Sequence, residues 1–246
     1  MSDALTILYR DKHYIAVDKP AGMLVHRSWI AEEEEVFLLQ TLRDQIGQRV
    51  YPIHRLDRPT SGVILFALSG EAARRMCGVF EQRGVTKEYM AIVRGYTDER
   101  GHIDYPLREE PHKPEQQAVT DYQRLATVEL PIATGRYNTS RYSLVRVTPV
   151  TGRMRQIRKH FHHIFHPLIG DTSHGEGRHN RLFRDHFDCH RLLLHAHRLV
   201  LSHPDSGAPL AIEAALPREY MALFEAFGWQ GSLCTPGVAP TPAHTC

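Results

Sequence analysis

Apolar residues recur along the chain at two spacings, and the changes between them predict alternating strands and helices. Near the N-terminus, the alternating runs 5–9 and 14–17 flank a polar turn, which is typical of two paired strands. The segment Lys19-Pro20-Ala21-Gly22 then predicts a tight turn, because proline fixes one backbone dihedral and glycine tolerates a positive φ.

The central part of the chain continues this alternation with longer elements. Residues 35–46 have helical spacing, and Gly47 follows as a stop. The continuous apolar run 63–68 is short enough to be a strand buried on both faces. Ser69 after it is a candidate N-cap for a helix that ends at Gly84. Further strands are predicted at 88–95, 118–128 and 141–147.

A helix with two distinct faces is predicted at 155–165. One face is apolar and the other basic, and they consist respectively of Ile157, Phe161, Ile164 and Phe165, and of Arg155, Arg158, Lys159 and His162. A strand at 192–201 and a helix at 217–227, stopped by Gly228, complete the pattern. We therefore predict one α+β domain over residues 1–230, which can divide into two lobes. Residues 231–246 are rich in Pro, Thr and Ala and are predicted to form a flexible tail.

The composition narrows the class of protein. With 246 residues, 42% hydrophobic and 24% charged, the chain is typical of a globular protein and excludes a coiled coil, a collagen or a wholly disordered chain. No apolar run approaches the roughly 18 residues that span a bilayer. The four cysteines show no C-x-x-C spacing, so we expect free thiols in a reducing cytoplasm and no disulfide frame or zinc knuckle.

The charge is unevenly distributed. The formal net charge is only +2, yet residues 136–203 carry 12 Lys and Arg against 4 Asp and Glu, together with 11 of the 17 histidines. Such an excess is either a solvated face or a surface for nucleic acid or another polyanion.

The most informative motif is H-R-L-D-R-P-T-S-G at 54–62, directly before the buried strand. Asp57 lies there between Arg55 and Arg58, and close cations favour the ionised form of a carboxylate. This pattern suits an aspartate that acts as nucleophile or base and argues against a proton donor. The alternative is a structural ion pair that anchors a loop.

A second motif, T-G-R-M-R-Q-I-R at 151–158, leads into the two-faced helix. Its arginines can bind phosphates through their planar forks, or one can turn inward as the partner of a buried acid. An exposed basic helix face is the simpler alternative. Tyr89, which opens a strand in Lys87-Glu88-Tyr89, is either a core residue or a ligand contact.

These motifs, in this order, resemble those of the pseudouridine synthases, in the branch that contains the large-subunit rRNA and tRNA enzymes. The resemblance covers residues 5–229. Besides 54–62 and 87–89, it includes K-P-A-G at 19–22, T-G-R at 151–153 with Q-I-R at 156–158, H-P-L-I-G-D at 166–171 and L-H-A at 194–196. Three further runs, at 24–29, 44–48 and 133–137, are similar to the members that isomerise uridine 65 at the acceptor end of the tRNA T-stem.

The resemblance implies a fold and a set of site residues. The expected fold is a mixed, largely antiparallel central sheet flanked by helices and loops, with the active site in a cleft that crosses it. Asp57 would be the catalytic aspartate, Tyr89 the aromatic that packs on the flipped uracil, and Arg158 the arginine that pairs with Asp57. Arg55 would enter the helical stack that the target base leaves, and Thr60, Ser61 and Gly62 would shape the catalytic loop. The RNA contacts expected beside Arg55 are His54, Arg58, Thr60, Arg153, Arg155 and Lys159.

Two positions depart from the family pattern. Many relatives carry His where Arg155 stands, and Tyr is common where His174 stands. Neither position belongs to the expected catalytic set, but both bear on the RNA contacts inferred from the family.

The reaction that the resemblance implies is an isomerisation and therefore redox-neutral, so its chemistry requires no cofactor and no metal. The expected partner is tRNA, with no obligatory protein partner and a monomeric enzyme. Asp57 would either attack C1′ of the ribose or remove a ribose proton to give a glycal. Three alternatives stay open: a synthase for another tRNA or rRNA uridine, a non-catalytic RNA-binding protein, and a metal-dependent hydrolase. The last is suggested by the histidine-rich sequence, namely His160, His162, His163, His166, His186, His190, His195 and His197.

Overall fold

The computed structural model describes residues 4–26, 37–110 and 112–232. The start of the helix predicted at 35–46, most of the 24–29 motif and nearly all of the predicted tail lie outside these residues. None of the helices within the described ranges is both long and apolar enough to cross a bilayer.

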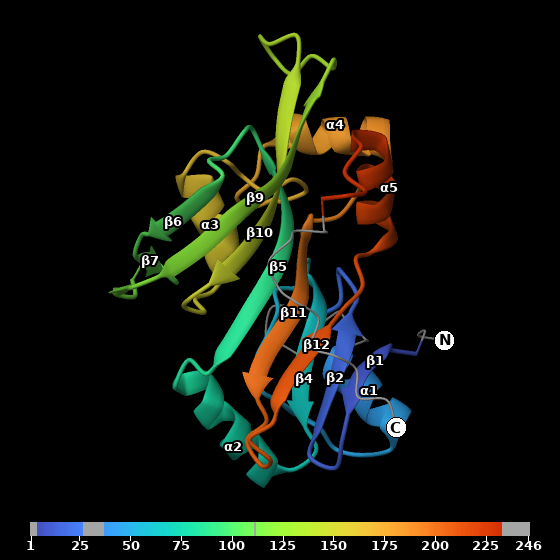
Figure 1. Ribbon diagram of the computed structural model, residues 1–246, viewed down its shortest axis with the longest axis vertical. Coiled ribbons are helices and arrows are strands. Elements are labelled where there is room, and N and C mark those ends of the chain that lie inside the picture. The colour runs from blue at the N-terminus through green and yellow to red at the C-terminus, as the bar shows by residue number, and fades with distance from the viewer. Residues whose placement is uncertain (1–3, 27–36, 111, 233–246) are drawn as a thin grey trace.

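A ten-stranded sheet forms the centre of the molecule (Figure 1). Its main path runs β1-β2-β4-β11-β5-β10-β9-β6, with β12 paired to β11 and β3 paired to β4. The strands are β1 (Ile7–Arg10), β2 (Tyr14–Lys19), β3 (Tyr51–Pro52), β4 (Ser61–Ala67), β5 (Val85–Arg94), β6 (Arg100–Asp104), β9 (Val119–Leu130), β10 (Ser140–Pro149), β11 (Leu194–Ser202) and β12 (Pro209–Glu213). A small separate ribbon pairs β7 (Leu107–Arg108) with β8 (Glu115–Gln116). Every pair of these strands is antiparallel except β4 with β11, which confirms the mixed, largely antiparallel sheet.

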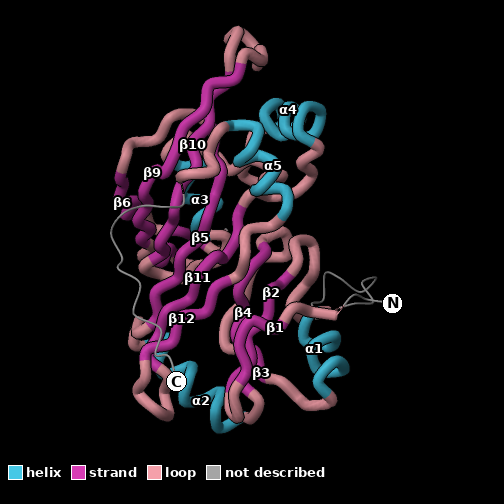
Figure 2. Tube along the Cα trace, turned by 45° about the vertical axis from the view of Figure 1, so that its right-hand side comes forward, coloured by secondary structure: helices cyan, strands magenta, loops and turns pink. Residues whose placement is uncertain are grey.

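Five helices in the described part of the chain cover this sheet. They are α1 (Leu38–Ile46), α2 (Gly70–Glu81), α3 (Gln156–His163), α4 (Gly177–Phe187) and α5 (Arg218–Phe227). Figure 2 shows α4 and α5 together at one end of the molecule and α1 and α2 at the other. The alternation of strands and helices confirms the α+β class.

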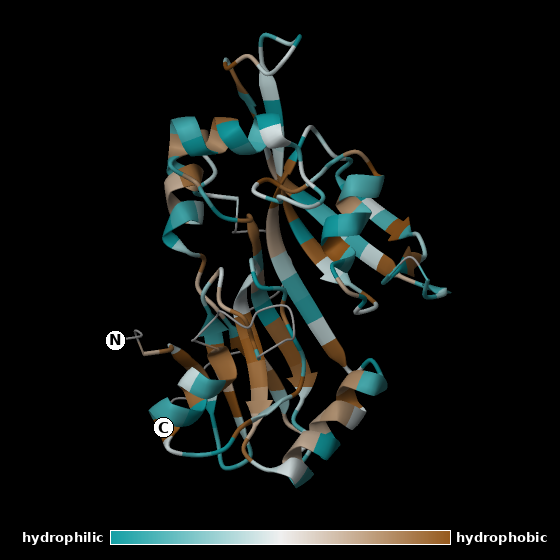
Figure 3. Cartoon of the chain, turned by 180° about the vertical axis from the view of Figure 1, so that it is seen from behind, coloured by the Kyte–Doolittle hydropathy of each residue, from teal (hydrophilic) through white to brown (hydrophobic). Residues whose placement is uncertain are grey.

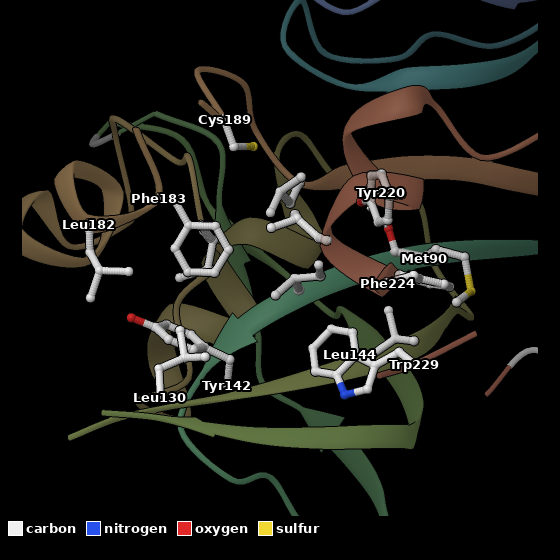
Figure 4. Packing of buried hydrophobic residues seen from close by; sticks show 14 residues of the cluster. Met90, Leu130, Tyr142, Leu144, Leu182, Phe183, Cys189, Tyr220, Phe224 and Trp229 are labelled. Atoms are coloured by element: carbon white, nitrogen blue, oxygen red, sulfur yellow. Dashed lines mark hydrogen bonds between the residues drawn. The ribbon is translucent and has the colours of Figure 1, made fainter. Parts of the chain in front are cut away.

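The side chains of β5 alternate between two cores. Met90 and Ile92 belong to a cluster under α4 and α5, which includes Tyr220 and is shown in Figure 4. The Tyr220 hydroxyl donates to the Met90 carbonyl at 2.9 Å inside it. Ala91 belongs to the opposite cluster, under α3. Because successive side chains of a strand point to opposite faces, α3 and α5 are held on opposite sides of the same strands.

Two further clusters lie around the other half of the sheet. One packs under α1 and includes Ile64 and Phe66, and the other packs under α2 and includes Val63 and Leu65. One continuous sheet runs through all four clusters. Its half under α1 and α2 and its half under α3, α4 and α5 are called the two lobes below.

Some predicted boundaries were wrong. The helix capped by Ser69, whose hydroxyl accepts from the Ala72 amide at 3.1 Å, ends at Glu81 and not at Gly84, because Arg83 takes a φ of 57°. The helix predicted at 155–165 covers only Gln156–His163. Phe165 follows it with a φ of 63° and is 77% exposed, so it is no part of the apolar stripe. Helix α4 was not predicted.

Candidate active site

One row of the sheet contains Tyr89 and also Gly62, the last residue of the 54–62 motif. Going across the strands, Lys19 pairs with Gly62, Gly62 with Ala196, Ala196 with Tyr89, and Tyr89 with Val147. These residues come from β2, β4, β11, β5 and β10, so the row joins the two lobes. Tyr89 packs against both the cluster under α1 and the cluster under α3. The row therefore places Tyr89 where the two lobes meet.

Gly62 allows the loop before β4 to approach this row closely. Its φ is +110°, and a Cβ there would lie 2.2 Å from the Ala196 carbonyl oxygen. Any larger residue would push β4 away from β11, with which it pairs in parallel. Asp57 comes five residues earlier, in a turn closed by a 3.0 Å bond from the Thr60 amide to the Asp57 carbonyl. The end of the 54–62 motif is thus fixed against the centre of the sheet.

Lys19 binds the backbone of the same loop through its side-chain ammonium group. Its side chain is fully buried, and Nζ donates to the carbonyl oxygens of Pro20, Arg58 and Thr60 at 2.9, 3.0 and 2.8 Å. Burial and the positive charge of Arg191 lower the pKa of Lys19 to about 7, against the opposing effect of Asp57. The sequence showed this lysine only as part of a turn motif, and its role in holding the catalytic loop was missed.

Arg158 connects the loop to the other lobe. Its guanidinium donates to both carboxylate oxygens of Asp171, at 2.7 and 2.8 Å, and through Nη1 to Asp57 Oδ2 at 3.1 Å. The Arg158 side chain is only 5% exposed and that of Asp171 is fully buried, whereas 26% of the Asp57 side chain remains exposed. The prediction that Arg158 turns inward to an acid is confirmed, and Asp57 is the one of its two acids that still faces outward.

Asp171 fixes the arginine that holds Asp57. Burial alone would raise the pKa of Asp171, but the bonds from Arg158 and from the amides of His174 and Ser173, both 2.9 Å long, lower it. For Arg158, burial acts to lower the pKa, but Asp171 and Asp57 raise it. Both groups therefore stay charged, in a geometry set by paired bonds. Asp171 was missed as a site residue, although it ends the H-P-L-I-G-D motif, because only the fold shows which acid Arg158 meets.

Tyr89 completes the group as a neutral phenol. It is half-buried, and burial, together with the nearby charge of Asp57, raises its pKa well above the usual range. The ring offers an apolar surface beside the carboxylate, and the hydroxyl keeps its proton at neutral pH. Asp57, Tyr89 and Arg158 are therefore brought to one place, as the sequence predicted.

A buried polar chain supports the loop behind Asp57. Arg191 donates to the Ser61 hydroxyl, which is 2.8 Å from His195 Nδ1. Burial lowers the pKa of His195 to about 4, so the ring is neutral and can accept the Ser61 proton. This chain ties β4 to β11 next to Gly62, and no local motif indicated it.

Several of the predicted RNA contacts lie at the surface around this centre. Arg55 and Arg155 are exposed, and Arg155 forms the N-cap of α3 with a φ of 56°. Arg153 Nε donates to the Gln117 carbonyl at 3.1 Å and Arg58 Nε to the Gly22 carbonyl at 2.9 Å, while both side chains stay exposed. Lys159 Nζ donates to the Arg108 carbonyl at 2.7 Å.

Two other predicted contacts point inward. His54 Nε2 accepts from the Leu65 amide at 3.1 Å, and the ring stacks on Phe80 with centroids 5.3 Å apart. Burial lowers the pKa of His54 to about 3. Thr60 is 3% exposed. This geometry gives both residues a structural role and lends no support to direct contact with RNA.

The histidine-rich sequence is spread over separate positions. His160 bonds Thr120 and the Tyr105 carbonyl, at 2.9 and 3.0 Å, and His163 stacks on Tyr105. Within the ranges that the structure describes, no three His, Cys, Asp or Glu side chains gather in a way that could hold a metal ion. The hydrolase alternative therefore lacks, among the described residues, the ligand cluster on which it depended.

The fold is that of solved pseudouridylate synthases. The human RNA pseudouridylate synthase domain containing 1 superposes with a TM-score of 0.69 at 26% identity, over 87% of this chain and 84% of that chain. The sequence profile of the RNA pseudouridylate synthase family matches residues 13–163, more than half of the chain. The chain belongs to this family.

Curated relatives are similar over nearly their whole length. The tRNA pseudouridine synthase C of Vibrio cholerae is 52% identical over 239 residues, which is 93% of this chain and 98% of that protein. The tRNA pseudouridine synthase C of Haemophilus ducreyi is 54% identical over 235 residues, covering 92% and 96%. The resemblance seen in the sequence motifs is thereby confirmed.

Proposed function

We propose that the protein converts a uridine of tRNA into pseudouridine, with Asp57 as the reacting carboxylate. The observation that carries this proposal is the arrangement of Asp57, Arg158 and Asp171 beside Tyr89: one partly exposed carboxylate held by a buried arginine that a second carboxylate fixes. A protein that only bound RNA would have no evident need for a carboxylate placed in this way. The names of the relatives, tRNA pseudouridine synthase C, support tRNA as the substrate class.

The reaction breaks the bond between uracil N1 and ribose C1′, turns the base and forms a bond between C5 and C1′. In one route Asp57 would attack C1′ and displace the uracil as an anion, and the bond between Asp57 and C1′ breaks when C5 bonds to C1′. In the other, Asp57 would remove a ribose proton so that a glycal forms, and would return that proton when C5 adds to C1′. In both routes the reacting group is the carboxylate anion, and Arg158 Nη1 donates to its Oδ2 atom at 3.1 Å. The C5 proton is lost after the new bond forms, and N1 gains a proton, so the step is balanced without an oxidant.

The target base has to leave the RNA helix before this chemistry. Unstacking and unpairing cost a few kcal/mol. Tyr89 would offset part of this cost by stacking on the extruded uracil, since base–aromatic stacking is worth about 1–3 kcal/mol. Arg55, exposed beside the catalytic loop, would occupy the space that the base leaves. Arg153, Arg155 and Lys159, which flank Arg158 in the 151–159 segment, would bind the backbone phosphates of the flanking nucleotides.

For the position of the uridine, we propose uridine 65 of tRNA. The support is the likeness of the 44–48 and 133–137 motifs to members that act there. The first motif covers the end of α1 and the turn after it, and the second lies between β9 and β10, so neither belongs to the catalytic centre. They are therefore suited to the choice of substrate and not to the chemistry.

We also propose that the enzyme is a cytoplasmic monomer. The thiols of Cys77 and Cys189 are free, as is usual in a reducing compartment. Sedimentation or light scattering at micromolar concentration would contradict the monomer if it gave twice the 28.2 kDa mass.

The test is carbodiimide mapping of pseudouridine in tRNA incubated with the enzyme or with Asp57→Asn. We expect a new reverse-transcription stop at nucleotide 65 with the enzyme, no stop with the variant, and similar tRNA affinity for both. A stop at another tRNA position or in rRNA would keep the reaction and correct the substrate. Turnover by Asp57→Asn similar to that of the unmodified enzyme would contradict the proposed chemistry.

A further inference from the structure

The β9–β10 hairpin projects well beyond the catalytic centre. Val147 of β10 pairs with Tyr89, and β10 begins seven residues earlier, at Ser140. At about 3.3 Å per residue, the start of β10 is about 23 Å from the site, and the hairpin tip lies farther out. Figure 1 shows this tip extending past α4 at the end of the molecule. The tip contains the 133–137 motif, to which the catalytic chemistry assigns no role.

The tip is a closed turn that presents an arginine. Thr134 and Tyr137 pair across it, with the Thr134 amide donating to the Tyr137 carbonyl at 3.0 Å, and Gly135 has a φ of +66°. Arg136 lies over the ring of Tyr137, 5.0 Å from its centroid, and donates to the Tyr137 hydroxyl at 2.8 Å. The ring is 61% exposed. Tyr137 thus holds Arg136 in place at the surface.

Helix α4 reaches the tip through a second arginine. A Cβ at Gly135 would lie 2.6 Å from Arg178 Nη1, so the glycine leaves room for the guanidinium against the turn. Arg181 and Arg184 follow at intervals of three residues, and all three arginines are exposed. Figure 3 shows α4 largely in the hydrophilic colour. Arg136, Tyr137, Arg178, Arg181 and Arg184 form one surface, here called the tip–α4 surface.

The arginines of this surface have no carboxylate partner among the residues that the structure describes. Among the described residues, none of Arg136, Arg178, Arg181 and Arg184 forms an ion pair, whereas the nearby carboxylates of Glu129 and Glu176 are paired with Arg141 and Arg94. Asp185 is the only acidic residue within α4. Four guanidinium groups without carboxylate partners suit the phosphates of a nucleic acid, to which they can present planar forks.

The same helix is tied to the catalytic centre. The Asn180 side chain accepts from the Gly170 amide and donates to the Asp171 carbonyl, both at 2.8 Å. Asn180 is buried on the inner side of α4. Because Asp171 fixes Arg158, the tip–α4 surface has a set position relative to Asp57.

We propose that the tip–α4 surface binds the phosphate backbone of the substrate tRNA at a second place, at least about 20 Å from the flipped uridine. This proposal rests on tRNA being the substrate. Its arginines contribute to affinity for the tRNA and take no part in the chemical step. Such a contact would give the 133–137 motif, which lies outside the catalytic centre, a role in substrate binding.

The test compares two triple variants on intact tRNA. One is Arg178→Ala with Arg181→Ala and Arg184→Ala. The matched control, Arg74→Ala with Arg83→Ala and Arg218→Ala, removes three exposed arginines elsewhere and so makes the same change in net charge. Thermal unfolding of both variants checks the fold. Initial rates at several salt concentrations give kcat, KM and the salt dependence of KM.

We expect the α4 variant to raise the KM for tRNA at least tenfold with kcat within twofold of the unmodified enzyme. Each lost phosphate contact should lower the slope of log affinity against log salt by about 0.7–0.9. Arg136→Ala alone should raise KM severalfold, and the control variant should change KM less than twofold. Equal effects of the two triple variants, or an unchanged KM, would overturn the proposal. If the unmodified enzyme formed no pseudouridine in tRNA, the proposed function itself would be refuted. The carbodiimide map tests that outcome separately.

Discussion

Arginine does two different things in two regions of this molecule. At the catalytic centre, Arg158 is 5% exposed and bonds two carboxylates, so its charge is balanced and its position fixed. On the tip–α4 surface, Arg178, Arg181 and Arg184 are exposed and have no carboxylate partner among the described residues. The comparison indicates that burial with paired acids makes arginine a positioning group, whereas exposure without them makes it a binding group for polyanions.

Removing a partner from the buried arginine should have the largest effect. In Asp171→Asn, Arg158 keeps Asp57 as its only carboxylate, and the paired bonds that fix its guanidinium are lost. We expect kcat to fall at least a hundredfold. Breaking a buried ion pair costs about 3–5 kcal/mol, so the free energy of unfolding should fall by a similar amount.

Single-turnover rates and urea unfolding measure these two effects. Arg158→Ala should also lose activity, because Asp57 then has no partner. The α4 triple variant is the control from the other region, since it should leave both kcat and stability nearly unchanged. If Asp171→Asn kept a normal single-turnover rate, the positioning role of the Arg158 pair would be wrong.

Lowering the pH should destabilise the protein through the buried region that contains His195 and His54, and not through the exposed tip–α4 surface. The folded-state pKa of His195 is about 4 and that of His54 about 3, both below the ordinary 6.5, because burial disfavours the charged ring. Between pH 6.5 and 4, His195 and His54 become protonated in the unfolded chain but stay neutral in the folded protein. The free energy of unfolding therefore falls as the pH falls through this window. For His195 the loss reaches on the order of 3 kcal/mol at pH 4.

Urea unfolding at pH 7, 5.5 and 4 tests this dependence. His195→Gln removes one of the two groups and should flatten the curve. Parallel curves for the unmodified protein and His195→Gln would show that His195 does not produce the loss.

The smallest expected effect concerns Arg155, which is exposed like the arginines of the tip–α4 surface but close in sequence to the buried Arg158. Arg155 is exposed at the N-cap of α3, only three residues before Arg158. We expect Arg155→Ala to weaken tRNA binding by a few fold, because it removes one exposed phosphate contact, with little change in kcat. Filter binding at two salt concentrations measures it. A dissociation constant equal to that of the unmodified enzyme would exclude Arg155 from the RNA contacts.

Local sequence patterns predicted most elements of the fold but few of the contacts between them. The strands β2 and β4 and the helix capped by Ser69 follow from alternation, an apolar run and a capping hydroxyl within a few residues. Helix α4 was missed, because arginines and histidines outnumber the apolar residues that face the core, such as Phe183.

The candidate site divides in the same way. Asp57, Tyr89 and Arg158 belong to short motifs and were predicted. Lys19 and Asp171 act across the fold, through bonds to the loop at 58–60 and to Arg158, and no local spacing determines such contacts. His54 lies in the most informative motif, but its ring accepts from the Leu65 amide and stacks on Phe80. The motif alone does not show these contacts, because both partners lie outside it.

The order of strands in the row from Lys19 to Val147 has a consequence for when the enzyme becomes active during its synthesis. β11, which separates Gly62 from Tyr89 in that row, is one of the last strands to leave the ribosome. A nascent chain that ends between Arg158 and Leu194 already contains Asp57, Tyr89 and Arg158 but still lacks this strand. We therefore expect no catalysis from a nascent chain that ends before β11.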